Sequence, residues 1–313
     1  MRRIWFSSQF QRKNQSALLA LVIAFTLSAP LSAEASRNGV EEPTNTFTVG
    51  ISFKFGEVEE LCSGAMLTST LVITAGHCAI SPTGVKGSDY LFTKPGVRLD
   101  AAIDPRIVQP KVIKIITDPQ FSAQDINNFN DIAFLQLDKP FYVERYLKLA
   151  TASDLAQLTA QSQVAGYGYG KVYESGANYS LYPRRYQLSW EGIDSNTVLA
   201  NTFTVTSPVA TACKGDSGGP ILATLPNGGE LLVGVLSGAS AVVDGCGTPA
   251  PDGSFYLRMT AGHPFLPLIK SLYDPLTGRA PLVKTTIRCK KGSVIKKVTA
   301  LKPACPKGYT RLK

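Results

Sequence analysis

Apolar and polar residues alternate over much of the chain, which is the pattern of β-strands that bury one face. The clearest case runs from Phe47 to Phe55, where every second residue is aromatic or aliphatic and the residues between are threonine, glycine, serine and lysine. Short apolar runs predict further strands at 61–67, 71–74, 112–116, 132–137, 163–168, 231–239 and 255–259. The pattern therefore predicts an all-β chain built from many short strands.

Other segments interrupt this alternation. Residues 81–110 and 171–185 are rich in turn-forming or polar residues, so we expect loops and edge strands there. A stretch near 149–158 is predicted to link two strand-rich halves. Apolar spacing over 264–273 predicts a short helix that closes the second half.

Beyond Pro275 the composition changes abruptly, and residues 276–313 are predicted to form an appended module. Residues 287–298 have the pattern of a small hairpin with a turn at 290–293. A hairpin of this size does not fold alone, and Cys305 is in a position to staple it to Cys289.

The composition agrees with a β-rich fold. The chain has 313 residues, 44% of them hydrophobic, which is enough to bury a large core without two independent domains. Only 18% are charged, and 27 glycines and 20 prolines favour strands joined by turns over long surface helices.

The formal net charge of +9 suggests an anionic partner, but its distribution changes that interpretation. Four basic residues precede position 14, eleven follow position 278, and all 23 acids lie between, so residues 14–278 carry a charge of −6. The body is mildly acidic, and the basic character belongs to the two ends.

Residues 1–35 have the layout of a secretory signal peptide, with a basic leader, an apolar run from Ala17 to Ala29, and small residues ending in Ala33-Glu34-Ala35. The alternative is a membrane anchor, but this run is shorter than the roughly 20 residues that span a bilayer. We expect cleavage after Ala35, a secreted protein (extracellular or periplasmic), and no transmembrane segment in the mature chain.

Export makes the six cysteines candidates for disulfides, although sequence alone does not choose among the possible pairings. They fall into three local pairs, which are Cys62 with Cys78, Cys213 with Cys246, and Cys289 with Cys305. The tight Cys and His spacing of a zinc site is absent, as are phosphate loops and cofactor fingerprints. We expect neither a metal nor a cofactor.

The run from Cys213 to Pro220 places Ser217 among glycines, an acid and a cysteine. A serine hydroxyl is a weak nucleophile at neutral pH, so it needs a base and a group that stabilises an oxyanion. The chain has two histidines to act as the base, His77 and His263, and each follows the same Thr-Ala-Gly tripeptide. The question is therefore which histidine faces Ser217.

Three blocks together resemble the signature motifs of trypsin-like serine proteases of the chymotrypsin family. The blocks are Thr74-Ala75-Gly76-His77-Cys78, Asn130-Asp131-Ile132-Ala133 and Gly215-Asp216-Ser217-Gly218-Gly219-Pro220. They occur in the family's order of His, Asp and Ser, at separations of 54 and 86 residues. The resemblance covers residues 38–273 and excludes the tail.

This resemblance implies a fold of two six-stranded antiparallel β-barrels, at about 36–155 and 156–275, with a short C-terminal helix and the active site between the barrels. The small hairpin tail at 276–313 is additional to that fold. The layout as a whole is similar to that of secreted proteases of a bacterial type.

The resemblance also implies the roles in a serine endopeptidase. His77 would take the proton of Ser217, Asp131 would hold the imidazole, and the main-chain N–H groups of Gly215 and Ser217 would bind the oxyanion. His263 lies outside the family's blocks, so we expect it to have a turn or surface role.

By the same resemblance, Cys62–Cys78 would clamp the histidine segment and Cys213–Cys246 would shape the substrate pocket. Ordinary stapling of an exported domain explains these bridges equally well.

The substrate pocket implied by the resemblance departs from the usual pattern. Its floor residue would be Thr211, which carries no charge to select arginine or lysine side chains. The other expected pocket residues are Ser237, Gly238, Ala239 and Ser254. Ala239 and Ser254 would fill space that glycine often leaves open, so we expect a narrowed pocket that prefers small or medium uncharged side chains.

Activation in this family uses a freed amino terminus that pairs with the acid before the nucleophile, here Asp216. Asn38-Gly39 resembles the end of the family's N-terminal motif, which would place the first mature residue at Ser36. Signal cleavage after Ala35 would create that terminus directly.

The partners implied are polypeptide substrates and protein inhibitors. The competing function is a catalytically inactive relative that serves as a binding or adhesion module. The tail either contacts an anionic surface or polymer or is a solvated appendage that aids solubility. Specific nucleic-acid binding is not expected, because Tyr309 is the single aromatic residue of the tail.

Overall fold

The computed structural model describes most of the chain after position 38. The described residues are 39–94, 109–124, 130–171, 182–190, 202–207, 210–239, 242–243, 246–251, 255–273, 285–300 and 304–312. The expected signal peptide at 1–35, Ser36 and Ser254 lie outside these residues.

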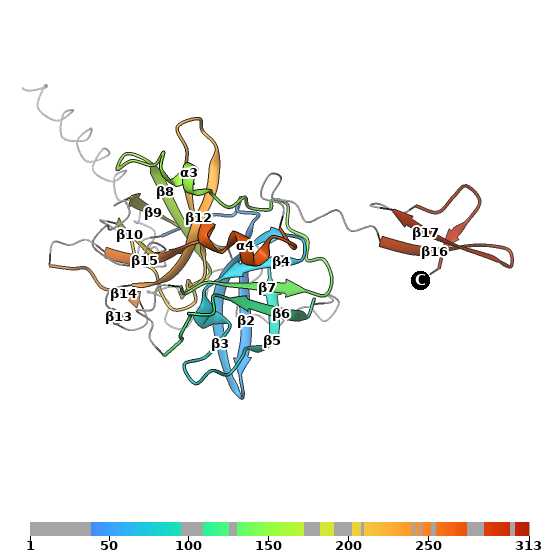
Figure 1. The fold of residues 1–313 in the computed structure, drawn as a ribbon, viewed down its shortest axis with the longest axis horizontal. Coiled ribbons are helices and arrows are strands. Elements are labelled where there is room, and N and C mark those ends of the chain that lie inside the picture. Colours follow the sequence, from blue (N-terminus) through green and yellow to red (C-terminus); the bar gives the residue numbers. More distant parts are fainter. Residues whose placement is uncertain are drawn as a thin grey trace, which may run out of the picture. The chain divides into compact units, whose positions relative to one another are not determined.

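The first half of the chain forms an antiparallel six-stranded sheet (Figure 1). Its strands are β2 (Thr48–Phe55), β3 (Val58–Thr68), β4 (Leu71–Thr74), β5 (Ser88–Thr93), β6 (Val112–Thr117) and β7 (Ala133–Leu137). They are ordered β5-β2-β3-β4-β7-β6. The side chain of Gln109, just before β6, bonds the main-chain N and O of Phe92 in β5 at 3.0 and 3.1 Å, which links the two end strands of this half-barrel.

The second half forms a closed six-stranded barrel. Its strands are β8 (Gln163–Gly168), β9 (Arg184–Trp190), β10 (Thr202–Ser207), β11 (Pro220–Thr224), β12 (Glu230–Ala239) and β15 (Phe255–Ala261). The ladder runs β8-β9-β10-β15-β12-β11 and returns to β8, so no edge remains unpaired. A two-stranded pair, β13 (Val242–Val243) and β14 (Cys246–Gly247), lies outside the barrel ladder.

A short strand at the start of the described chain, β1 (Val40–Glu41), pairs with β9 of the second barrel. The guanidinium of Arg184 supports this pairing, because its Nε donates to the carbonyl of Gly39 at 3.0 Å. The beginning of the chain is therefore held on the second barrel, although it precedes the first barrel in sequence.

Helical segments in the described part of the chain are short and lie between strands. They are the 3-10 turn η1 (Gly76–Cys78), the helix α3 (Ala152–Leu155), the 3-10 turn η3 (His263–Phe265) and the helix α4 (Leu266–Ile269). The expected closing helix at 264–273 is η3 followed by one α-helical turn; Pro264 and Pro267 lack the N–H donors of a longer helix. In the expected linker, Thr151 and Asp154 form a capping box that starts α3.

Three apolar clusters make up the core. One fills the first half-barrel, one fills the second barrel, and the third joins residues of both, including Leu71, Phe134, Leu222 and Leu232. Phe265 and Ile269 of the closing segment belong to this third cluster. Each fully buried side chain of this size contributes about 1.5–3 kcal/mol to folding, so the shared cluster fixes one barrel against the other.

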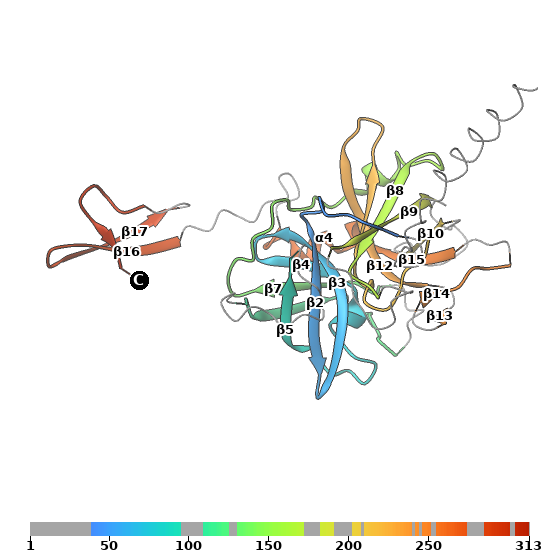
Figure 2. The same ribbon diagram turned by 180° about the vertical axis from the view of Figure 1, so that it is seen from behind.

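This architecture confirms the expected all-β fold with two barrels and a short C-terminal helix. Figure 2 shows the same strands from behind. No helix among the described residues is both long enough and apolar enough to cross a membrane.

The tail forms a three-stranded sheet of its own. The expected hairpin is β16 (Thr285–Lys291) with β17 (Val294–Ala300), and a third strand, β18 (Thr310–Arg311), pairs with the other edge of β16. Cys289 and Cys305 are joined by a disulfide. Periodicity missed β18 because two residues are too few to show it.

Candidate active site

Two neighbouring strands bring His77 and Asp131 together. His77 lies in η1 directly after β4, Asp131 lies two residues before β7, and Thr74 of β4 is paired with Ala133 of β7. The carboxylate of Asp131 meets His77 twice: Oδ1 accepts from the main-chain N–H at 2.8 Å, and Oδ2 accepts from Nδ1 at 2.8 Å. With its proton on Nδ1, the imidazole keeps Nε2 as a free acceptor.

A third donor reaches Asp131 from the second barrel. The hydroxyl of Ser237, in β12, donates to Oδ2 at 2.6 Å. The Asp131 side chain is only 4% exposed. Burial raises the pKa of this carboxyl, but the charge of His77 and the hydrogen bonds from His77 and Ser237 outweigh burial and hold the pKa below its ordinary value. Asp131 is therefore ionised and fully occupied as an acceptor.

The pKa of His77 is raised above its ordinary value of 6.5. Burial lowers this pKa, and the charge of Asp131 together with its hydrogen bond reverses that effect. Two further charges act in opposite directions: Glu60 raises the pKa, and Arg258 lowers it. The imidazole side chain is 28% exposed, so one part of it faces solvent.

The loop that carries Ser217 packs against the strand end that carries His77. A Cβ at Gly218 would collide with the Thr74 hydroxyl and the main chain of Ala75, and Gly218 has a φ of 78°, which favours glycine. The carbonyl oxygen of Ser217 lies 3.7 Å from the sulfur of Cys78. The structure thus brings the main chain of the expected nucleophile beside the segment of the expected base.

Ser63, buried in β3, holds this loop at two points and also bonds Tyr169. Its main-chain N–H donates to the carbonyl of Ser217 at 2.8 Å, its hydroxyl donates to the carbonyl of Gly215 at 2.7 Å, and the same hydroxyl accepts from the N–H of Tyr169 at 2.9 Å. One side chain of the first half-barrel therefore fixes the conformation of the Gly215–Ser217 turn.

Gly215 has a φ of 100°, which only glycine adopts readily. Neither its main-chain N–H nor that of Ser217 donates to another residue in the described part of the chain. Between them, Asp216 is fully buried, and its carboxylate accepts from the N–H groups of Gly170 at 2.7 Å and Cys213 at 2.8 Å. The buried carboxylate of Asp216 therefore anchors the turn, and the main-chain N–H groups of Gly215 and Ser217 donate to no other described residue.

The comparison with known families agrees with this geometry. Residues 36–266 match the family model described as Trypsin. The chain belongs to the trypsin family. This match spans both barrels and excludes the tail.

Curated relatives support the same assignment. "Serine protease SP24D" of Anopheles gambiae is 30% identical over 64% of this chain and 68% of its own length. "Coagulation factor IX" of Oryctolagus cuniculus is 30% identical over 58% and 67%, and that of Cavia porcellus is 26% identical over 58% and 65%. The matches thus span about two thirds of each relative. All three are animal proteins and give no support to the expected bacterial type.

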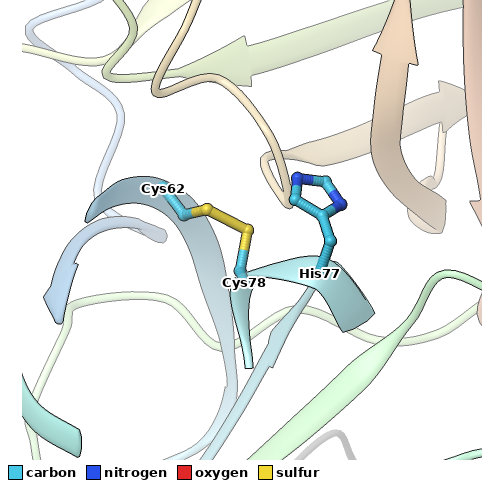
Figure 3. Close-up of side chains that lie close together, drawn as sticks. All are labelled: Cys62, His77 and Cys78. Carbon is cyan, nitrogen blue, oxygen red and sulfur yellow. A yellow bond between two sulfur atoms is a disulfide. The ribbon is translucent and has the colours of Figure 1, made fainter. Parts of the chain in front are cut away.

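In this trypsin-family domain, Cys62 is bonded to Cys78 and Cys213 to Cys246, as the local pairs suggested. Figure 3 shows the first bridge beside the imidazole of His77. Cys62, His77 and Cys78 lie close enough together to hold a metal, but sulfurs that are bonded to each other have no thiolate to offer. The first bridge instead ties η1, and hence His77, to β3.

Two of the expected pocket residues, Thr211 and Ala239, meet at Gly247, which directly follows Cys246 of the second bridge. Thr211 is fully buried, and a Cβ at Gly247 would collide with its hydroxyl and lie 3.0 Å from Cβ of Ala239. The hydroxyl of Thr211 has no hydrogen-bond partner among the described residues. Thr211, Ala239 and Gly247 therefore form one neutral group of contacts.

Ser237, Gly238 and His263 do not belong to this group of contacts. Ser237 was predicted to line the pocket, and its hydroxyl is bound to Asp131. Gly238 lies opposite Arg258 of β15, and a guanidinium nitrogen is 3.8 Å from where a Gly238 side chain would begin. His263, in η3, has no partner for Nδ1 among the described residues, and burial lowers its pKa.

Sequence reasoning missed three residues: Ser63 beside the loop, Ser237 as a donor to Asp131, and Arg258 with its effect on His77. Ser63 lies 152 positions from Gly215, and Ser237 lies 106 positions from Asp131. No local pattern marks such pairs.

Because the chain has two histidines, their titration can be followed residue by residue. We expect the imidazole of His77 to titrate above pH 6.5 and that of His263 below pH 6.5, from the opposite directions of their pKa shifts. NMR titration of the imidazole carbons measures both values, and His263→Gln assigns the signals.

The charges of Glu60 and Arg258 predict the direction in which two substitutions change the pKa of His77. Glu60→Gln should lower the pKa of His77 because it removes an attractive negative charge, and Arg258→Gln should raise it because it removes a repulsive positive charge. Glu57→Gln, at an exposed turn, is the matched control and should change nothing. A His77 pKa at or below 6.5, or shifts of the same sign, would contradict this electrostatic account.

Proposed function

We propose that the chain is a secreted serine endopeptidase that cleaves peptide bonds through an acyl-enzyme. The observation that carries this proposal is the buried pair of Asp131 and His77, with the Gly215–Ser217 turn packed against the same strand end. The family membership and the relatives supply the reaction class.

In the proposed mechanism, Ser217 Oγ forms a bond to the substrate carbonyl carbon while Nε2 of His77 accepts the hydroxyl proton. The carbonyl π electrons move to oxygen, and the N–H groups of Gly215 and Ser217 bind the resulting oxyanion, each worth about 3 kcal/mol. When the C–N bond breaks, the leaving amine takes the proton from His77. Water then repeats the sequence on the ester and releases Ser217.

The roles of the surrounding groups follow from their contacts. Asp131 stabilises the imidazolium that forms in each half-reaction, and Ser237 keeps that carboxylate oriented. Ser63 holds the carbonyl of Gly215, so the turn is set before substrate binds. Preorganised donors do not need to reorient as charge develops, which is the main source of their effect.

We propose that the pocket accepts small or medium uncharged side chains. Its support is the neutral group of Thr211, Ala239 and Gly247, in which the Ala239 methyl occupies space and the Thr211 hydroxyl brings no charge. Arginine and lysine would be buried there without a counter-charge, which is costly. The natural substrate is therefore cleaved after residues such as alanine or valine.

We also propose that export activates the enzyme by creating an amino terminus at Ser36 that pairs with Asp216. Gly39 is held by Arg184 of β9, Arg184 is paired with Gly168 of β8, and Gly168 lies against the carboxylate of Asp216. This chain of contacts places the start of the described chain on the same barrel as Asp216. The signal-like segment and the three disulfides support export.

The mature protein should react with a fluorophosphonate probe at Ser217 and hydrolyse peptides. Ser217→Ala should abolish both, Asp131→Asn should lower kcat by about 10⁴-fold, and His263→Gln should leave kcat unchanged. Activity should be lost as pH falls through the raised pKa of His77, since a protonated imidazole cannot accept a proton. A folded wild-type protein that neither labels nor hydrolyses would instead indicate an inactive binding module.

A panel of fluorogenic peptides that differ only before the cleaved bond tests the pocket. We expect alanine and valine to be preferred over arginine, lysine and phenylalanine. Ala239→Gly should raise the relative kcat/KM for phenylalanine by roughly tenfold, because it removes a methyl group from the pocket. Ala156→Gly, an exposed alanine beside α3, is the control. A preference for arginine or lysine in the wild type would refute the proposal.

Activation is tested with two mature forms, one starting at Ser36 and one with a single added residue before it. The extended form should lose roughly tenfold or more in kcat, because Asp216 would then lack its buried cationic partner. Asp216→Asn should remove the difference between the two forms. Equal activity of both forms in the wild type would count against this mechanism.

A further inference from the structure

The tail sheet has two distinct faces, set by the register of its strands. Side chains directly opposite each other on paired strands lie on the same face. Arg288 is opposite Lys297, and Lys290 is opposite Ile295. These four residues therefore share one face, which we name the open face.

The alternate residues form the second face, and the C-terminal segment covers it. Cys289 is bonded to Cys305, Lys296 lies 5.3 Å from the ring centre of Tyr309, and the side chain of Lys291 lies against Gly308. All three contacts come from residues that alternate with the open face. The C-terminal segment thus covers the part of this side where Cys289 is buried, while Lys291 and Lys296 remain exposed.

Arg288, Lys290, Ile295 and Lys297 are all exposed, and Ile295 is 54% exposed. Arg288 and Lys297 are cations that face each other across the ladder, an arrangement that destabilises an isolated sheet. Residues 279–313 contain eleven basic residues and no acid, so the tail has no counter-charge of its own. The open face is complementary to an external array of negative charges.

Several features of the open face distinguish among anionic partners. It carries no aromatic side chain on which a nucleic-acid base could stack, and Tyr309 lies with the covered face. It does carry an exposed isoleucine, Ile295, which lies opposite Lys290. Cations flanking exposed aliphatic side chains suit an anionic bilayer, where headgroups meet the cations and the aliphatic groups enter the interface.

We propose that the open face of the tail docks the protein onto membrane surfaces that contain anionic phospholipids. Arg288, Lys290 and Lys297 contact the lipid phosphates, and Ile295 contacts the boundary between headgroups and acyl chains. Each cation near such a surface strengthens binding by about fivefold. The docking is therefore weak, reversible and sensitive to salt. It does not depend on peptidase activity.

The test is co-sedimentation of the full-length mature Ser217→Ala protein with vesicles of phosphatidylcholine, with and without phosphatidylglycerol. We expect binding only to the anionic vesicles and release at high salt. The triple variant Arg288→Gln, Lys290→Gln, Lys297→Gln should bind on the order of 100-fold more weakly. Lys86→Gln, Lys114→Gln, Lys148→Gln removes the same charge from exposed positions of the peptidase domain and is the matched control.

Two further variants separate surface chemistry from folding. The charge-preserving variant Arg288→Lys, Lys290→Arg, Lys297→Arg should bind like the parent, and Ile295→Ser should weaken binding at constant charge. Equal losses in the two triple-Gln variants would overturn the proposal, since net charge alone would then explain binding. Binding to soluble polyphosphate but not to anionic vesicles would also overturn it and would identify a polymer as the partner.

Discussion

The buried carboxylate of Asp131 is the interaction on which the site depends. It accepts hydrogen bonds from the main chain and imidazole of His77 on the first half-barrel and from the hydroxyl of Ser237 on the second barrel. A charge with 4% exposure is stable in this position only because every donor is in place. The hydrogen bonds that stabilise this buried charge therefore link the two barrels and set the orientation of the His77 imidazole.

A second set of buried contacts positions the loop that carries Ser217. Ser63, from the first half-barrel, binds the carbonyls of Gly215 and Ser217, while Asp216 anchors the turn within the second barrel. Glycine at position 218 allows the loop to approach Thr74 without a steric clash. Separate hydrogen bonds between the two barrels thus position His77 and the loop that carries Ser217. The apolar cluster shared by both barrels adds to these contacts.

The tail is stabilised in a different way from the trypsin-family domain. Its described buried apolar residues are Ile287 and Cys289, which is too little surface for a core, so the disulfide and the covering segment hold the sheet together. A module with so small a core can carry a dense positive charge on its other face, which the mildly acidic body of the chain does not. The mildly acidic body and the basic tail are thus separate modules of opposite charge.

By itself, the sequence determined the β-rich class, the positions of most strands, the three motif blocks and the separate basic tail. These features are local: alternation has a period of two residues, and each motif is contiguous, so both are visible without the fold. Only the tertiary structure decided that Ser237 donates a hydrogen bond to Asp131 and that Ser63 holds the Gly215 turn. It also decided that Arg258 and Glu60 shift the pKa of His77 in opposite directions, and that β1 pairs with the second barrel. Such contacts join residues more than 100 positions apart, and the choice among possible partners is made by packing, which no local pattern encodes.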